Sequence, residues 1–254
     1  MTRRRLAVAL ALSSSLPVCA GELPFAPGET LTLRLTYAHL LAGRAWLRVQ
    51  PAEHAGRPAL DFLAEAKSQG FFAWLFRFRV DDRTVARWDP QSGCSLRIEK
   101  RLREGRARRD QVVTFDPATG AAQVEDPKIR QKSFDVGACA LDILSAFFVT
   151  RVRGVGDGRP LELPVFDNGK RYVLGVRLVG RETLDLPRPL GPGVRTLVVE
   201  PQLVEGTGLF VKEKGARLKI WLSDDARRLP VRLRSKVAIG SVSADLESYE
   251  PGAR

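Results

Sequence analysis

The sequence predicts a mostly β protein, built as a curved antiparallel sheet or an open barrel of about a dozen strands with one apolar helix. Apolar and polar residues alternate with a period of two along many short segments. Turns rich in Gly, Pro, Asn and Asp separate these segments. Only one segment carries an apolar surface broad enough for a buried helix. We therefore expect a single β-rich domain over residues 21–254, an ordinary size for sandwiches and barrels.

The first 20 residues have the features of an export signal rather than of a folded element. Three arginines at positions 3–5 precede an apolar and serine stretch over 6–16, and small residues lead up to Ala20. The apolar stretch is too short to span a bilayer as a helix. Cys19 leaves a lipidated form open, although Val18 departs from the lipoprotein pattern. The sequence predicts cleavage after Ala20, export to the periplasm and no transmembrane span.

The mature chain is basic and keeps two cysteines. Removal of the leader lowers the formal net charge from +12 to +9. Cys94 and Cys139 can form a disulfide in an oxidising compartment, and two separate buried thiols are the alternative. Their spacing does not resemble a zinc site, which needs four clustered ligands. We expect no metal and no cofactor.

In the first half of the domain, apolar and polar residues alternate most clearly at its start. Leu31, Leu33, Leu35 and Tyr37 alternate with polar residues, as on a half-buried strand. A second strand is expected near 44–49. Weaker strands are expected near 58–68, 83–88, 95–103 and 111–116.

One helix is predicted over about residues 138–153. Its apolar side chains include Phe147 and cover too much of the surface for a helix lying on water. Gly154 follows as a stop signal, and Arg151 suits the negative end of the helix dipole. Asp142 and Ser145 are expected on its polar side. The helix is expected to plug or cover the concave face of the sheet.

In the second half of the domain, apolar and polar residues again alternate along short segments. Tyr172 and Leu174 begin the clearest strand, and Asp224-Asp225 falls between two more. Asp in a short connection accepts hydrogen bonds from its own backbone, so we interpret this pair as a turn rather than a site. Strands are expected near 161–167, 171–178, 194–201, 218–222, 229–233 and 241–248.

The sequence resembles the bacterial exported family known only as domain of unknown function 3108. The resemblance rests on three short motifs: Phe25, Gly28, Glu29 and Tyr37 with Ala42-Gly43; Leu141, Leu144 and Ser145 before Arg151; and Ile220 to Asp225 with Arg228 to Val231. It implies an envelope protein of mostly β structure. It implies no reaction, because the family carries no established activity.

The densest positive charge lies within residues 97–109. A basic run of this kind indicates nucleic-acid binding in a cytosolic protein. Export and the lack of interleaved aromatic residues exclude that interpretation here. A solvated hairpin that protects a sheet edge is one alternative. The other is contact with an anionic envelope surface through Arg97, Lys100, Arg101, Arg103, Arg106, Arg108 and Arg109.

Five aromatic residues fall within the eight residues 71–78. They serve either core packing or a ligand cavity, since aromatic side chains dominate both. Together with the strand leucines and the helix they supply the predicted ligand-lining set: Leu31, Leu33, Leu35, Phe72, Trp74, Phe147, Tyr172 and Leu174.

Catalytic chemistry is weakly indicated. His39 and His54 each lack a second ligand at metal spacing, and the chain contains no G-x-S-x-G nucleophile motif. Asp81 and Asp82, with Asp89, could bind a metal or act as an acid pair, but the end of a strand explains them as well. No catalytic residue is assigned.

The leading hypothesis is a non-catalytic periplasmic protein that holds or carries an apolar envelope component, or binds an envelope protein partner. A hydrolase acting on envelope glycan or lipid through Asp81, Asp82 or Asp142 is the alternative. A structural subunit of an export machine is the third hypothesis.

Overall fold

The computed structural model describes residues 22–69, 79–127, 129–188, 190–206, 217–236 and 241–253. Within them the chain forms one sheet of 14 strands. The first eight strands are β1 (Thr30–Tyr37), β2 (Leu40–His54), β3 (Arg57–Ser68), β4 (Asp81–Trp88), β5 (Ser95–Glu104), β6 (Ala107–Asp116), β7 (Ala121–Asp126) and β8 (Ile129–Asp135). After the helix α2 (Ile143–Arg153) come β9 (Leu161–Asp167), β10 (Lys170–Leu184), β11 (Val194–Gly206), β12 (Arg217–Ser223), β13 (Pro230–Lys236) and β14 (Ser241–Glu250).

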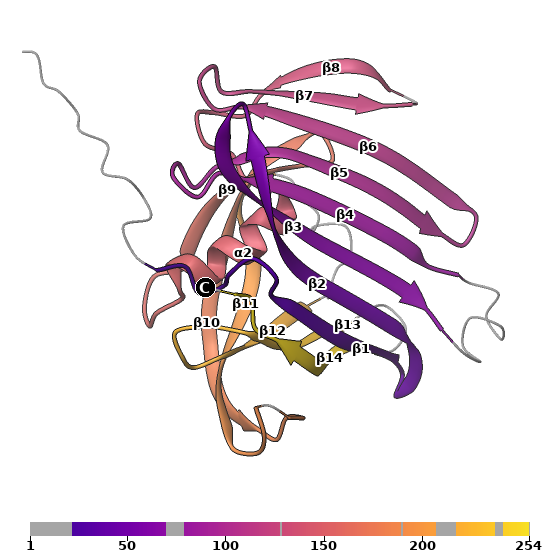
Figure 1. Ribbon diagram of the computed structural model, residues 1–254, viewed down its shortest axis with the longest axis vertical. Helices are drawn as coiled ribbons and strands as arrows, with labels where there is room; N and C mark the ends of the chain where they lie inside the picture. The colour runs from indigo at the N-terminus through magenta and orange to yellow at the C-terminus, as the bar shows by residue number, and fades with distance from the viewer. Residues whose placement is uncertain are drawn as a thin grey trace, which may run out of the picture.

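Two antiparallel meanders make up the sheet (Figure 1). Strands β1 to β8 lie side by side in chain order, and so do β9 to β14. The last strand, β14, pairs with the first, β1, which joins the meanders into one sheet whose edges are β8 and β9. Helix α2 connects these two edges. The predicted curved antiparallel sheet with one helix is confirmed.

The two edges of the sheet approach each other without pairing as strands in the described part of the chain. The rings of Phe134 in β8 and Phe166 in β9 lie 5.2 Å apart, centroid to centroid. The Arg109 guanidinium of β6 donates to the side-chain oxygen of Asn168, beyond β9, at 2.8 Å. The sheet is therefore curled like a barrel but remains open along the β8–β9 seam.

The main core lies between the sheet and α2, which packs against β3, β4 and β9. The ring of Phe62 in β3 stacks on that of Phe148 in the helix, with centroids 4.0 Å apart. The ring of Phe25 meets both edge-on, at 5.4 and 5.5 Å. Such aromatic geometry adds stabilisation beyond the burial of area. The segment before β1 thus closes the core over the helix.

A second apolar cluster lies where β1 meets β14. Leu31 and Leu33 pack there with Trp221, Leu246 and Tyr249. These two leucines, predicted as ligand-lining residues, therefore lie in a cluster separate from the main core. The reason is the pairing of β1 with β14, which sets these leucines against side chains of the closing strands.

The helix begins later than predicted. Leu141 is extended, because its N–H donates to Pro164 and its carbonyl accepts from Phe166, both in β9. Asp142 is the N-cap, so the helix starts at Ile143. It ends as predicted at Gly154, which has φ +70° and donates its N–H to the Thr150 carbonyl.

Candidate functional site: an apolar pocket beside the helix

A pocket of about 200 Å³ lies between one side of α2 and the strands β10 to β13. All but one of its lining residues are apolar. They are Ile143, Ala146, Phe147 and Thr150 of the helix, with Leu174, Val176, Val199, Pro201, Leu218, Ile220, Leu222 and Leu233 of the strands.

The pocket offers a ligand no free hydrogen-bonding side chain. Thr150, its one polar residue, donates its hydroxyl to the Ala146 carbonyl at 2.9 Å. Ile143 and Phe147 are only half-buried, so the helix side of the pocket is within reach of solvent. An engineered cavity of about 150 Å³ stays dry and binds benzene, whereas pockets for whole drug-sized ligands hold roughly 300–1,000 Å³. The site therefore suits part of an apolar molecule.

The predicted ligand-lining residues are divided by the structure. Phe147 and Leu174 line the pocket. Tyr172 is buried in the same core, where desolvation and the Asp167 carboxylate raise the pKa of its hydroxyl. Leu31 and Leu33 belong to the second cluster, and Leu35 is half-buried in β1 outside both. Phe72 and Trp74 lie outside the described residues.

A buried network fixes the start of the helix. Asp142 accepts the backbone N–H groups of Leu144 and Ser145, both at 2.9 Å, as an N-cap does. Its other oxygen accepts the hydroxyls of Ser95 and Ser145, both at 2.6 Å. Burial raises the pKa of this carboxyl against the effect of these bonds. Asp142 and Ser145 lie together, as expected from their spacing, and both are buried.

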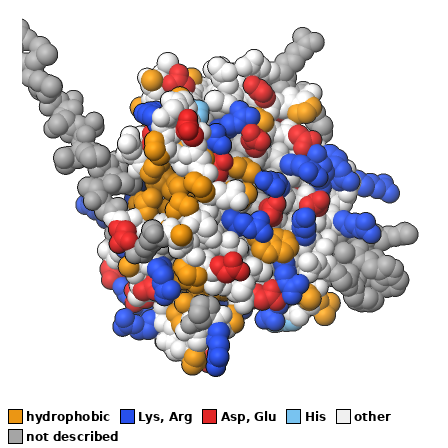
Figure 2. All heavy atoms as spheres, viewed as in Figure 1, with side chains coloured by type: hydrophobic (Ala, Val, Ile, Leu, Met, Phe, Trp, Pro, Cys, Tyr) orange, Lys and Arg blue, Asp and Glu red, His pale blue; other side chains and the backbone are white. Residues whose placement is uncertain are grey.

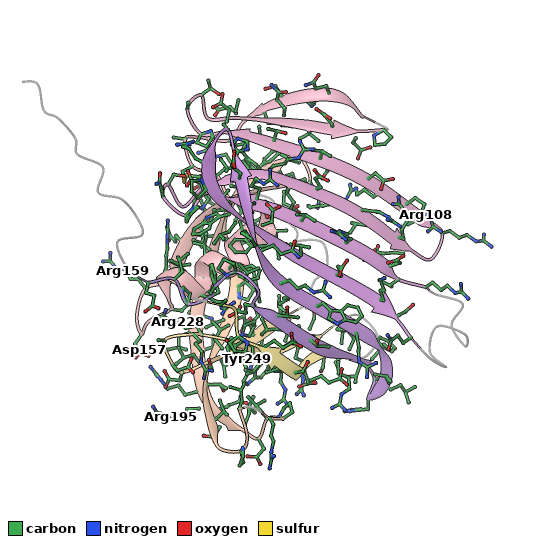
Figure 3. The ribbon with its side chains drawn as sticks, in the orientation of Figure 1. Arg108, Asp157, Arg159, Arg195, Arg228 and Tyr249 are labelled. Carbon is green, nitrogen blue, oxygen red and sulfur yellow. A yellow bond between two sulfur atoms is a disulfide. The ribbon has the colours of Figure 1, made fainter. Side chains whose placement is uncertain are left out.

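A buried ion pair fixes the end of the helix. Arg151 contacts the Glu29 carboxylate at 2.6 and 3.1 Å, and both side chains are almost completely inaccessible to water. Arg151 also donates to the carbonyls of Pro24 and Arg227. Arg228, labelled in Figure 3, donates back to the Arg151 carbonyl at 2.8 Å. One arginine therefore ties α2 to the segment before β1 and to the β12–β13 turn.

A disulfide joins Cys94 and Cys139, whose Cα atoms are 5.1 Å apart. Cys94 precedes β5 and Cys139 lies three residues before the helix N-cap. The bond links the β4–β5 connection to the entry of α2. One wall of the pocket is thus held at both ends.

The basic run within residues 97–109 is paired in part. Arg97 contacts Glu99 and Arg103 contacts Asp110. Figure 2 shows blue and red side chains interleaved over the visible face. Arg108 extends away from the β5–β6 turn (Figure 3), and Arg101, Arg106 and Arg109 are also exposed.

Lys100 does not belong to that surface. It is buried and forms an ion pair with Asp167 of β9. The period of two in a strand places Lys100 on the same face as Leu96 and Ile98, which is the core face. Its assignment to an anionic-surface contact is therefore wrong, and strand parity was the signal that could have revealed this.

The candidate carboxylates have separate roles. Asp81 and Asp82 are neighbours in β4 and so point to opposite faces of the sheet. Asp82 accepts the Arg103 N–H at 2.7 Å and hydrogen-bonds the Glu104 carboxyl, whose pKa is raised by burial and by this neighbour. Asp89 caps its own turn by accepting from Gln91 and Ser92. Among the described residues no group of three His, Cys, Asp or Glu side chains could hold a metal ion.

The turn interpretation of Asp224-Asp225 rests on the second residue. Asp225 accepts the backbone N–H groups of Arg227 and Arg228 and the hydroxyl of Ser223. Burial acts to raise the pKa of its carboxyl, but the bonds from Ser223 and Arg227 lower it overall. Asp224 is exposed and contributes its backbone N–H to the Arg195 carbonyl.

Together, the fold and the pocket define a class of protein: an open, barrel-like antiparallel sheet that holds one apolar helix. A solved structure with this architecture is the beta-barrel-like protein of domain of unknown function DUF1849 from Brucella abortus. It is 9% identical, with a TM-score of 0.60 over 90% of this chain and 99% of that one, which shows a shared fold alone. The chain itself belongs to the family described as Protein of unknown function (DUF3108), whose model matches residues 32–247. No curated protein matches the sequence.

The family match covers most of the motifs on which the resemblance rested. Phe25, Gly28 and Glu29 precede the matched range, whereas the helix and closing-hairpin motifs lie inside it. Helix α2 in the described part of the chain is too short to cross a bilayer.

Proposed function

We propose that the protein is a non-catalytic binding protein of the periplasm that holds the apolar part of an envelope component in the pocket beside α2. The observation that carries the proposal is the pocket itself. It is apolar on nearly every side, its one polar side chain is already hydrogen-bonded, and its wall includes residues of the main core. Burying apolar surface contributes about 25 cal/mol per Å², so an acyl chain or a similar group would be the natural occupant.

Two features support the periplasm as the compartment. The sequence opens with a basic and apolar stretch typical of an export signal. The Cys94–Cys139 disulfide also suits an oxidising environment. Intact-mass measurement of protein from the periplasmic fraction should give a chain that begins at Gly21. A chain that retains positions 3–5 in the cytoplasm would contradict this part of the proposal.

The function is tested by what the protein carries. Protein purified without detergent should release an apolar compound on organic extraction, detected by mass spectrometry. Leu218→Trp fills the pocket from β12 and should abolish the yield, whereas Val179→Trp, at an exposed position of β10, should not. A clean extract from wild-type protein, or equal yields from both variants, would contradict the proposal.

The hydrolase hypothesis gains little support from the candidate carboxylates. The Asp142 carboxylate accepts three hydrogen bonds from the first turn of α2 and one from Ser95 of β5, and Asp81 lies on the face opposite Asp82. Binding of an envelope protein partner remains a proposal of the same class as the carrier, and a clean extract would favour it.

A further inference from the structure

The end of the sheet at the β1–β2 turn exposes apolar side chains to water. Leu40 is 54% exposed, Leu41 46% and Val242 36%, and these are three of the five large apolar side chains exposed on the described surface. Figure 1 shows the turn at the lower right of the sheet, well away from α2. Apolar side chains that are exposed together, rather than singly, are typical of interaction surfaces.

The strand register brings these residues together. Leu40 of β2 stands opposite Tyr37 of β1, which stands opposite Val242 of β14. Leu41 stands opposite Thr36 in the next row. The apolar rim, which is Leu40, Leu41 and Val242, therefore lies at the end of β2 and β14, with Leu40 and Val242 on one face of the sheet and Leu41 on the other.

A basic groove of about 600 Å³ adjoins the apolar rim, and Leu41 belongs to both. Hydroxyl, imidazole and guanidinium groups make up most of its wall. The lining residues are Arg34, Thr36, His39, Leu41, Arg234, Ser241, Ser243 and Asp245.

The groove contains two exposed, positively charged guanidinium groups, those of Arg34 and Arg234. Arg34 is exposed; it stands opposite Asp245 across the β1–β14 pairing, and its charge also helps to lower the pKa of the Glu247 carboxyl. Arg234 is exposed and, among the described residues, donates only to the Ser243 hydroxyl, at 3.3 Å. The single acid of the groove, Asp245, is already paired with Arg232 on the neighbouring strand. The groove therefore keeps a net positive charge beside the apolar rim.

We propose that the apolar rim and the basic groove form a docking surface for an anionic phospholipid bilayer. Guanidinium groups and hydroxyls bind phosphate oxygens well, and each basic residue near an anionic membrane strengthens binding. The leucines and the valine would enter the boundary between head groups and acyl chains while Arg34 and Arg234 contact lipid phosphates. This pairing of apolar and basic groups fits a membrane surface better than a free phosphate ion, because the ion has no apolar part that could contact the rim.

The proposal differs from the surface that the basic run within 97–109 predicts. In that run Glu99 and Asp110 pair with Arg97 and Arg103, but four arginines stay exposed. The difference is that none of the large apolar side chains exposed on the described surface lies in the run. The inference rests on the proposed envelope location but not on the pocket beside α2. Leu218→Trp should therefore leave membrane binding unchanged, so the two proposals can fail separately.

The test is co-sedimentation of the mature protein, residues 21–254, with vesicles. Wild type should bind vesicles of phosphatidylglycerol and not those of phosphatidylcholine. The double variant Arg34→Gln/Arg234→Gln should bind roughly 25-fold more weakly, at about fivefold per basic side chain. Leu40→Ser/Leu41→Ser should also lose binding. Unchanged urea midpoints would show that the variants are folded.

Matched controls decide the interpretation. Arg101→Gln/Arg108→Gln removes the same charge from exposed positions of the basic run, and Val179→Ser removes an exposed apolar side chain elsewhere. Both controls should retain most of the binding. Equal losses in the two arginine pairs would show diffuse attraction by net charge and overturn the proposal. Absence of wild-type binding would overturn it too, and binding of inorganic phosphate without vesicles would assign the groove to a free anion instead.

Discussion

Arg151 and Glu29 form an ion pair with side-chain exposures of 0% and 2%. A buried pair of this kind does not by itself make a protein more stable, because desolvation opposes the attraction of the charges. Replacing one residue of the pair lowers the stability of the protein strongly, since the charge of the other residue stays buried without a partner. The face of the Phe25 ring lies near the guanidinium as well, at 5.1 Å. The pair therefore fixes where the helix ends rather than how strongly the protein folds.

Replacement of one partner should destabilise the protein strongly. Arg151→Met is expected to lower the free energy of unfolding by about 3–5 kcal/mol, measured by urea denaturation. Arg153→Met, an exposed change in the same helical turn, should alter it by less than about 0.5 kcal/mol. The double variant Glu29→Leu/Arg151→Met should recover much of the loss. A double variant as unstable as the sum of both single variants would contradict this account.

Asp142 gives the stability a pH dependence with a defined sign. Burial raises the pKa of its carboxyl above the ordinary value of 3.8. The native state therefore favours the protonated form, so stability is fully present below the ordinary pKa and is lost as the pH rises through the raised one. Each pH unit within that window costs at most about 1.4 kcal/mol.

The variant Asp142→Asn should lack the pH dependence of stability that comes from the Asp142 carboxyl. Its amide oxygen can still accept from Leu144 and Ser145, and its amide nitrogen can donate to the two serine hydroxyls. The free energy of unfolding of wild type minus that of the variant, measured from pH 4 upward, should fall with rising pH and then level off. A difference that rises with pH would mean that hydrogen bonding, not burial, controls the carboxyl.

At the scale of elements, sequence patterns predicted the features that depend only on residues close together in the chain. The alternation of Leu31 to Tyr37 marks β1, and Gly154 marks the end of α2. The start of the helix was missed because Leu141 bonds to β9, a strand that follows it in the sequence. Strand order was out of reach for the same reason, since β1 pairs with β14 at the far end of the chain.

The disulfide should contribute to the stability of the helix entry. It closes a loop of 45 residues, for which the chain-entropy model gives about 4 kcal/mol. Thiol counting on denatured, unreduced mature protein should find no free thiol. Reduction should lower the urea midpoint, and Cys94→Ser/Cys139→Ser should reproduce that midpoint in both redox states. Two free thiols in unreduced protein would contradict the bond.

The candidate site was only partly visible in the sequence. Phe147 and Leu174 were predicted from apolar patterns and line the pocket. Residues such as Val199 and Pro201 were missed, because they reach the pocket only through the pairing of β10, β11 and β12. Glu29 was noted only as part of a family motif, and no local signal connects it with Arg151, 122 residues away.

At the scale of the whole molecule, the described part of the curled sheet leaves an apolar space beside α2 that side chains do not fill. Strands β10 to β13 form one wall, and α2 forms the other. The helix is fixed at its start by Asp142 and the disulfide and at its end by Arg151. Binding to a wall that is already fixed costs less free energy than binding that must first order it, which favours this pocket as a binding site.

The most direct test is a calorimetric titration of the delipidated mature protein with a series of fatty acids of increasing chain length. If the pocket binds the chain, affinity should rise about fourfold for each added methylene, from about 0.8 kcal/mol per buried CH₂. The rise should stop once the chain outgrows a pocket of about 200 Å³. The whole dependence should disappear in Leu218→Trp and persist in Val179→Trp. Affinity that is independent of chain length, or equal in both variants, would contradict the proposal that this pocket holds an apolar ligand.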